Sequence, residues 1–254
     1  MKIALAQIDM GWEDKKAAKA KILSLIRSLP ATERLDWLVF PEMTLSGFSL
    51  HQDQATLDAA DLAFFADLAR QHNTAISFGG VEDGHNNLIT MDKTGQIISR
   101  YSKTHLYCFG QEHKSYKPGS TLERFALNGL SIAPIVCFDL RFPYLFWNQA
   151  LQTDLFVVIA SWPARRSEHW LRLLQARAIE NQAYVVGVNR TGRDPSVEYS
   201  GNSMIFDPLG KPLLDCQSQE GVFLCEADVT HSGVVKVRDR FPFLKERRAD
   251  LPFA

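Results

Sequence analysis

The sequence has no excess of charge of either sign. Its 254 residues carry a formal net charge of −1, and no block of like charges stands out along the chain. Proteins that bind nucleic acid or an anionic membrane usually present a strongly basic surface. We therefore expect neither nucleic acid nor a membrane among the partners of this protein.

Long apolar runs are also missing. No stretch approaches the roughly 20 apolar residues that a membrane-spanning helix needs. The short apolar run at the N-terminus meets Asp9, Glu13 and Asp14 too early to form a secretion signal, so we predict a cytoplasmic protein. Hydrophobic residues make up 46% and charged residues 22% of the chain, which is typical of a folded globular protein.

Cysteine pairs with metal-ligand spacing are absent as well. Cys108, Cys137, Cys216 and Cys225 form no C-x-x-C pair, and none has a histidine at the spacing of zinc ligands. In a reducing compartment they should be free thiols, and a free cysteine is most often a small buried apolar residue. The sequence thus predicts neither a metal nor another cofactor.

Short apolar runs alternate with helical patterns through most of the chain. Runs rich in aliphatic residues predict strands at residues 2–8, 35–40, 74–78, 130–136, 154–160 and 184–189. Apolar residues three or four positions apart predict helices ending at Pro30, over 62–72, after Pro143 and over 170–182.

Two similar hairpins divide this pattern into similar halves. Each has Asp at the start of a tight turn and Gly at its end, in Asp92–Gly95 and in Asp207–Gly210. The repeat predicts an α/β fold in which two similar sheets face each other, each covered by helices on its outer side. Because no linker rich in Ser, Gly or Pro divides the chain, we predict a single domain over residues 1–254, with a C-terminal tail from about residue 241.

Three chemically reactive or charged side chains follow predicted strands or hairpin ends. Glu42 comes after Phe40-Pro41, Lys103 after Tyr101-Ser102, and Cys137 after Ile135-Val136. The crevice beyond the carboxyl ends of strands is the usual place for a site in α/β sheets. Each residue alone has an ordinary structural explanation, but together they supply a nucleophile, a base and a cation.

These segments resemble the motifs of the nitrilase superfamily of carbon–nitrogen hydrolases. The matching motifs are Phe40-Pro41-Glu42, Tyr101-Ser102-Lys103-Thr104-His105-Leu106 and Cys137-Phe138-Asp139-Leu140-Arg141-Phe142-Pro143. The resemblance covers nearly the whole chain and implies a four-layer α-β-β-α sandwich that forms a homodimer. It also implies catalytic roles for Cys137, Glu42 and Lys103, and supporting roles for Glu112 and the backbone N–H of Phe138.

These residue types suit the hydrolysis of an amide. A thiol with the ordinary pKa of about 8.5 is mostly protonated at pH 7. We expect Lys103 to favour the thiolate of Cys137, and Glu42 to take its proton as general base. Attack on the amide leaves a thioester that water then hydrolyses. Arg141 is expected to hold the nucleophile loop through Asp139 or a main-chain carbonyl, and the neighbouring histidine of the lysine motif, His105, to be structural.

The overall likeness is closest to the ω-amidase branch of the superfamily. This implies the monoamides of small 2-oxo dicarboxylic acids, such as 2-oxoglutaramate and 2-oxosuccinamate, as substrates. We expect Arg165 or Arg166 to pair with the free carboxylate of the substrate, beside Trp162. Tyr144 and Leu171 stand where many relatives have Glu, which leaves the finer substrate preference open.

Three alternatives stay open. The same catalyst could act on another small amide, a nitrile or an N-carbamoyl compound. A papain-like enzyme would pair Cys137 or Cys108 with a histidine, but it leaves Glu42 and Lys103 unexplained. A non-catalytic binding protein on the same fold would be expected to lose one of these residues, and this chain keeps them all.

Overall fold

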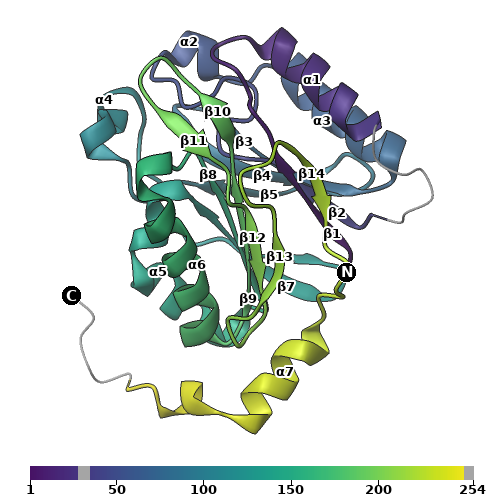
Figure 1. Ribbon diagram of the computed structural model, residues 1–254, viewed down its shortest axis with the longest axis vertical. Helices are drawn as coiled ribbons and strands as arrows, with labels where there is room; N and C mark the ends of the chain where they lie inside the picture. The colour runs from purple at the N-terminus through teal and green to yellow at the C-terminus, as the bar shows by residue number, and fades with distance from the viewer. Residues whose placement is uncertain (28–34, 249–254) are drawn as a thin grey trace.

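The computed structural model describes residues 1–27 and 35–248 of the chain. Two six-stranded β-sheets pack face to face, and helices cover the outer face of each sheet, which gives four layers (Figure 1). The α-β-β-α sandwich predicted from the sequence is therefore confirmed. Within the described ranges, no helix is long and apolar enough to cross a membrane.

The first sheet comes from the N-terminal half of the chain, apart from one edge strand. Its strands are β1 (Ile3–Gln7), β2 (Trp37–Val39), β3 (Ala75–Glu82), β4 (His85–Met91), β5 (Ile97–Ser102) and β14 (Gly221–Leu224). They lie in the order β14-β1-β2-β3-β4-β5, with β1, β2 and β3 parallel and the other pairs antiparallel. The helices of this half are α1 (Lys15–Arg27), α2 (Gln52–Ala55), α3 (Ala59–His72) and α4 (Glu112–Ser115).

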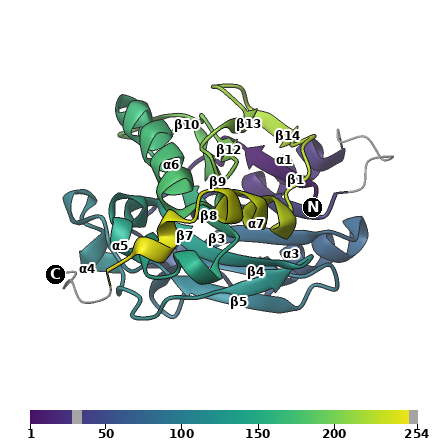
Figure 2. The ribbon, with the colours of Figure 1, turned by 90° about the horizontal axis from the view of Figure 1, so that it is seen from below.

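The second sheet is built in the same way from the C-terminal half. Its strands are β6 (Phe125–Leu127), β7 (Leu130–Val136), β8 (Leu155–Ala160), β9 (Tyr184–Asn189), β12 (Met204–Phe206) and β13 (Pro212–Asp215). They lie in the order β13-β12-β9-β8-β7-β6, with β7, β8 and β9 parallel. The α-helices of this half are α5 (Pro143–Trp147), α6 (Ser167–Asn181) and α7 (His231–Arg240), and a small hairpin of β10 (Thr191–Arg193) and β11 (Glu198–Ser200) lies outside the sheet. Figure 2 shows α7 at the end of the sandwich near the N-terminus.

The internal repeat predicted from the two hairpins is confirmed. Three parallel strands followed by an antiparallel hairpin occur as β1-β2-β3-β4-β5 and again as β7-β8-β9-β12-β13. Gly95 and Gly210 close the hairpin turns with φ of 80° and 78°, a region that glycine adopts without strain. The carboxylates of Asp92 and Asp207 accept backbone N–H bonds from the turns that follow them.

Helix ends follow their local sequence signals. α3 begins at a capping box in which Asp58 and Asp61 each accept the other's backbone N–H, and it ends at Asn73 in the left-handed conformation. α5 has Pro143 at its first position, where a missing N–H costs nothing. α6 ends at Gln182, which also has a positive φ, and β9 starts two residues later.

Several element boundaries differ from the prediction, among them the start of α3 at Ala59 rather than at residue 62. β3 continues through Gly79-Gly80, where the sequence predicts its end, because both glycines pair with residues of β4. α5 has only five residues, and α6 begins at Ser167 rather than at Trp170. The predicted helix end at Pro30 lies outside the described residues.

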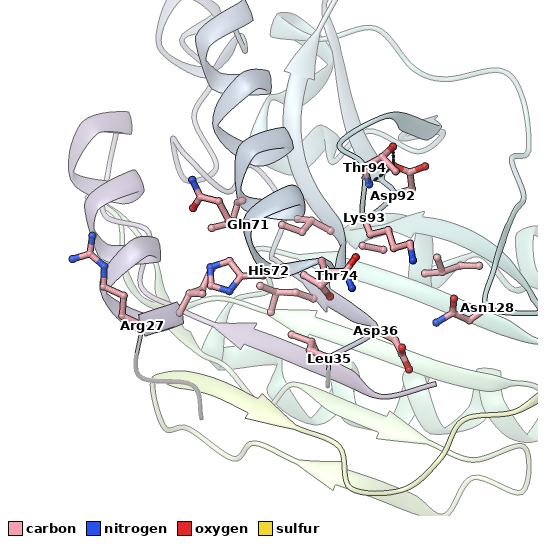
Figure 3. A pocket seen from close by; sticks show the side chains of 17 residues that line it. Arg27, Leu35, Asp36, Gln71, His72, Thr74, Asp92, Lys93, Thr94 and Asn128 are labelled. Atoms are coloured by element: carbon pink, nitrogen blue, oxygen red, sulfur yellow. Dashed lines mark hydrogen bonds between the residues drawn. The ribbon is translucent and has the colours of Figure 1, made fainter. Parts of the chain in front are cut away.

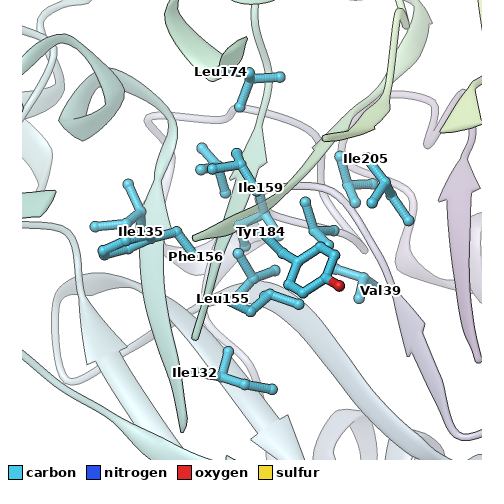
Figure 4. Close-up of a cluster of buried hydrophobic side chains, with 14 of the residues drawn as sticks. Val39, Ile132, Ile135, Leu155, Phe156, Ile159, Leu174, Tyr184 and Ile205 are labelled. Atoms are coloured by element: carbon cyan, nitrogen blue, oxygen red, sulfur yellow. The ribbon is translucent and has the colours of Figure 1, made fainter. Parts of the chain in front are cut away.

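One apolar core lies between the two sheets, and a second packs the first sheet against α1 and α3. Apolar side chains from both sheets meet in the first core, and Figure 4 shows Val39 of β2 near Leu155 and Tyr184 of the opposite sheet. Because most of these side chains are completely buried, the two sheets form a close-packed support whose strand ends are held in place. The single-domain interpretation stays a prediction, which this shared core supports.

Candidate active site

A tight turn after β2 places the carboxylate of Glu42. Met43 has φ of 49°, and Thr44 donates from Oγ1 to the Pro41 carbonyl at 2.7 Å. Thr44 also bonds to the backbone of Gly79 in β3 in both directions, at 2.9 and 3.0 Å. A Cβ on Gly79 would lie only 2.4 Å from the Met43 nitrogen. The glycine that lengthens β3 therefore makes room for the turn that carries Glu42.

Lys103 directly follows β5 and lies between two buried carboxylates. Its Nζ is 2.9 Å from Glu42 Oε1 and 3.0 and 2.9 Å from the two oxygens of Glu112. Asn86 donates from Nδ2 to Oε1 of both glutamates at 2.8 Å, and the backbone N–H of Ser161 donates to Glu42 Oε2 at 2.8 Å. The side chains of Lys103, Glu42 and Glu112 are all fully buried.

The two carboxylates keep Lys103 charged. Burial lowers the pKa of its ammonium, but the negative charges of Glu112 and Glu42 outweigh that effect and hold the pKa well above its ordinary value. Lys103 is thus a fixed cation at the pH of the cell, and its three N–H donors face the two carboxylates.

Cys137 starts a 3₁₀ turn (Cys137–Arg141) directly after β7. Its φ of 47° is uncommon for a residue other than glycine, and its side chain lines a cavity although the residue is only 9% exposed. Phe138 is the second residue of the turn, where a backbone N–H has no acceptor within the helix. The local backbone therefore presents a thiol and a free donor side by side.

The thiol of Cys137 retains its proton in the free protein. Burial raises its pKa well above the usual range, and the Glu42 carboxylate raises it further. Lys103 acts in the opposite direction, as the sequence predicts, but it is outweighed. Lys103 alone therefore does not ionise the thiol, and Cys137 needs a base at the moment of attack.

The nucleophile turn and the segment after Lys103 are tied together by Asp139. Its buried carboxylate accepts from the hydroxyl of Tyr101 at 2.8 Å, from the backbone N–H of Thr104 at 3.3 Å, and from both the backbone N–H and Nδ1 of His105 at 2.7 and 2.8 Å. The His105 ring also stacks on Phe142 at 3.7 Å. His105 thus makes the structural contacts expected of it.

The structural role predicted for Arg141 is wrong. The guanidinium that holds the nucleophile turn belongs to Arg177 of α6, which donates to the Leu140 carbonyl at 2.8 and 3.2 Å. Arg141 instead lines the cavity, where its guanidinium lies 4.7 Å from the centre of the Trp162 ring and 3.2 Å from Nδ1 of His169.

The cavity in front of Cys137 has a volume of about 900 Å³. It brings together most of the predicted site residues, namely Lys103, Cys137, Phe138, Trp162, Arg165 and Arg166. Glu42 and Glu112 lie behind Lys103 rather than on the cavity wall. Aromatic side chains form much of the remaining wall: Trp12, Phe48, Tyr107, Phe109 and Tyr199.

Arginines concentrate positive charge on one side of the cavity. Burial lowers the pKa of Arg141, and the nearby charge of Arg166 lowers it further. Arg166 donates to the Tyr107 hydroxyl at 3.2 Å and lies 5.5 Å from its ring centre, whereas Arg165 is exposed at the rim. Within residues 1–27 and 35–248, no carboxylate forms an ion pair with any of the three guanidiniums. This side of the cavity suits an anionic group.

Asn86 was missed by the sequence reasoning. It is completely buried at the start of β4, and its only sequence signal is a pair of polar residues, Asn86-Asn87, inside an apolar strand. The backbone N–H of Ser161 was also missed, because a main-chain donor leaves no trace in residue type.

The described residues contain no metal-binding cluster of His, Cys, Asp and Glu side chains. A second cavity of about 880 Å³ lies at the opposite edge of the first sheet, before the start of β2 and β3 (Figure 3). It is lined by Arg27, His72, Asp92 and Lys93 among others, and it contains none of the predicted site residues.

Two facing sheets that carry a lysine between two glutamates beside a thiol have the architecture of a nitrilase-type hydrolase. The carbon–nitrogen hydrolase family matches residues 2–239 of the chain. The chain therefore belongs to this family of hydrolases, as its motifs indicated.

Relatives support the same assignment. The chain is 34% identical to omega-amidase YafV of Escherichia coli K12, covering 95% of this chain and 94% of the relative. It is 33% identical to 2-oxoglutaramate amidase of Bacillus subtilis 168, covering 87% and 88%. The crystal structure of XC1258 from Xanthomonas campestris, a CN-hydrolase superfamily protein with an arsenic adduct in its active site, matches with a TM-score of 0.90 and 31% identity over 100% and 99% of the two chains.

Proposed function

We propose that this hydrolase is an ω-amidase, which cleaves the terminal amide of a small 2-oxo dicarboxylic acid monoamide such as 2-oxoglutaramate or 2-oxosuccinamate. The products are the dicarboxylate and ammonia. The observation that carries the chemistry is the Lys103 ammonium held between Glu42 and Glu112 beside the Cys137 thiol. The names of two relatives, an omega-amidase and a 2-oxoglutaramate amidase, support the substrate class.

In the first step, Cys137 attacks the amide carbon and Glu42 takes the thiol proton. Glu42 Oε1 already accepts from both Lys103 and Asn86, whereas neither of these donors contacts Oε2, which accepts from the Ser161 backbone N–H. Oε2 is therefore the oxygen with room for the proton. A base is required because the pKa of the thiol is raised.

The carbonyl oxygen becomes an oxyanion as the C–S bond forms. We assign Lys103 Nζ and the backbone N–H of Phe138 as its donors, which the family resemblance and the presence of both residues at the cavity support. Loss of one such donor typically costs roughly 3 kcal/mol of barrier. Glu112 has a supporting role, since it holds Lys103 through both of its carboxylate oxygens.

The intermediate collapses when the C–N bond breaks. Glu42 returns its proton to the departing nitrogen, ammonia leaves, and the acyl group stays on Cys137 as a thioester. Water then attacks the thioester, with Glu42 again taking a proton, and the proton returns to the sulfur as the carboxylate product leaves. One carboxylate thus serves both half-reactions.

The free carboxylate of the substrate would bind among the arginines. The sequence pointed to Arg165 or Arg166, and the geometry favours Arg166 together with Arg141, because both lie inside the cavity while Arg165 is exposed. An anion between the two guanidiniums would relieve their mutual repulsion. The Trp162 ring, stacked by Arg141, fixes one side of this pocket.

Ammonia release from a panel of compounds tests this proposal. The panel contains ω-amides of 2-oxo acids, uncharged amides, nitriles and N-carbamoyl amino acids, assayed with wild type, Cys137→Ala and the exposed-cysteine control Cys108→Ala. We expect the 2-oxo acid amides to be the best substrates, with activity lost only in Cys137→Ala. Preference for a nitrile or carbamoyl compound would replace the proposed substrate, and full activity of Cys137→Ala would overturn the mechanism.

We also propose, from the family resemblance, that the enzyme is a cytoplasmic homodimer. The molecular mass in solution tests the dimer: a mass near the 28.7 kDa of one chain would contradict it.

A further inference from the structure

The amide of Asn86 forms a closed ring of hydrogen bonds with the charged groups of the site. Its Nδ2 and the Nζ of Lys103 both bond to the same two atoms, Oε1 of Glu42 and Oε1 of Glu112, at 2.8 to 3.0 Å. The register of β4 and β5 produces this contact, because the backbone N–H of Lys103 also bonds to the Asn86 carbonyl at 2.9 Å. Two carboxylates and one ammonium leave the cluster with an excess negative charge, which Asn86 stabilises without adding a charge.

The geometry settles which end of the amide faces the glutamates. If Oδ1 stood in place of Nδ2, an amide oxygen would face two carboxylate oxygens with no hydrogen between them. In the observed orientation Oδ1 has no hydrogen-bond partner among the described residues. A buried carbonyl without a partner lowers the stability of the protein. The contribution of Asn86 at this position is therefore its two N–H donors to the glutamates.

The hydrogen bonds at Oε1 determine which oxygen of Glu42 can carry the proton taken from the thiol. Oε1 of Glu42 accepts from Asn86 and from Lys103, and neither donor can become an acceptor there. We propose that Asn86 is a positioning residue that holds Glu42 by Oε1 and directs the transferred proton to Oε2, the oxygen that neither Asn86 nor Lys103 contacts. This inference rests on the proposed function of Glu42 as the base and goes beyond it, because it assigns the proton to one atom and names the residue responsible.

The pH dependence of catalysis tests this role. Asn86→Leu replaces the amide with an apolar side chain of similar size and removes both donors. We expect kcat to fall at least about tenfold and the acid limb of the pH profile of kcat/KM to move up by about one pH unit, because a carboxylate that loses a donor is protonated more easily. KM should change less than about threefold, since Asn86 does not line the cavity.

The neighbouring Asn87→Leu is the matched control. Asn87 is also buried in β4, but its side chain bonds to Ser102 Oγ and the Glu82 carbonyl instead of to the site. It should alter thermal stability without moving the acid limb. If Asn86→Leu does not fold, Asn86→Ala is judged by the same two quantities. A folded Asn86 variant with kcat within about twofold of wild type and an unmoved acid limb would overturn the inference.

A second readout separates this inference from the proposed substrate. p-Nitrophenyl acetate acylates a reactive thiol and releases p-nitrophenolate in a burst, whichever amide is the natural substrate. The burst rate at Cys137 should show the same shift in its acid limb in Asn86→Leu. If wild type releases ammonia from no member of the panel but the burst of Asn86→Leu shows this shift relative to wild type, the ω-amidase proposal fails and the role of Asn86 stands. A wild type whose Cys137 is not acylated at all would overturn both.

Discussion

The most specific prediction about substrate choice concerns the side of the cavity that carries Arg141 and Arg166. Arg141→Met removes one charge, and the unbranched methionine keeps an apolar contact with the Trp162 ring. A charge-assisted hydrogen bond to a carboxylate is worth roughly 1.5–3 kcal/mol. Because Arg166 remains and partly compensates, we expect a loss of about 2 kcal/mol, or about 30-fold in kcat/KM for 2-oxoglutaramate, carried mainly by KM.

The assay compares two amides of the same chain length that differ in charge. Steady-state ammonia release is measured with 2-oxoglutaramate and with pentanamide, and the loss caused by Arg141→Met should fall only on the charged substrate. Arg165→Met is the matched control: Arg165 is exposed at the rim, so its effect should stay below about threefold.

The double variant of Arg141 and Arg166 sharpens this test. The nearby charge of Arg166 contributes to the lowered pKa of Arg141, so removing one guanidinium relieves the other. The losses of transition-state stabilisation caused by the two single variants should therefore not add up to the loss in the double variant. Equal losses on 2-oxoglutaramate and pentanamide, or no loss on 2-oxoglutaramate in either single variant, would refute the assignment of the carboxylate to these arginines.

Three further predictions concern the support of the site. Gly79→Ala should lower kcat by about tenfold or more, because its Cβ would displace the turn of Glu42, whereas Gly80→Ala should destabilise the protein with kcat retained; the reverse order would contradict this. Asp139→Asn should lower stability by about 3 kcal/mol, or Tm by roughly 6–12 °C, and an unchanged melting curve would count against its tying role. Iodoacetamide should alkylate Cys137 ever faster above pH 9, because its pKa is raised; a plateau below pH 7 would indicate a papain-like ion pair instead.

The positions of the reactive residues could be predicted because they follow from the pattern of strands. Short apolar runs end just before Glu42 and Cys137, Lys103 follows the second strand of a hairpin, and strands that run in the same direction bring their carboxyl ends to one edge. The repeat of two hairpins also predicted the facing sheets. These features depend on residue type and local order, which a single sequence contains.

What could not be predicted depends on packing between segments that are distant in sequence. Arg141 and Arg177 are equally good candidates for the Leu140 carbonyl until α6 is placed against the nucleophile turn. Asn86 reaches the glutamates only through the register of β4 against β5. Burial and the Glu42 carboxylate favour the protonated thiol of Cys137, whereas the Lys103 ammonium favours the thiolate. Which influence prevails depends on distances between groups, and residue types do not reveal these distances.

The thioester on Cys137 is the most direct test of the central claim. Wild-type enzyme is mixed with excess 2-oxoglutaramate, quenched in acid within the first turnovers, digested and analysed by mass spectrometry. We predict that the peptide containing Cys137 carries the acyl group of the substrate, and that Cys137→Ala forms no adduct and releases no ammonia. Turnover by Cys137→Ala, or an acyl group found on another residue such as Cys108, would contradict the claim.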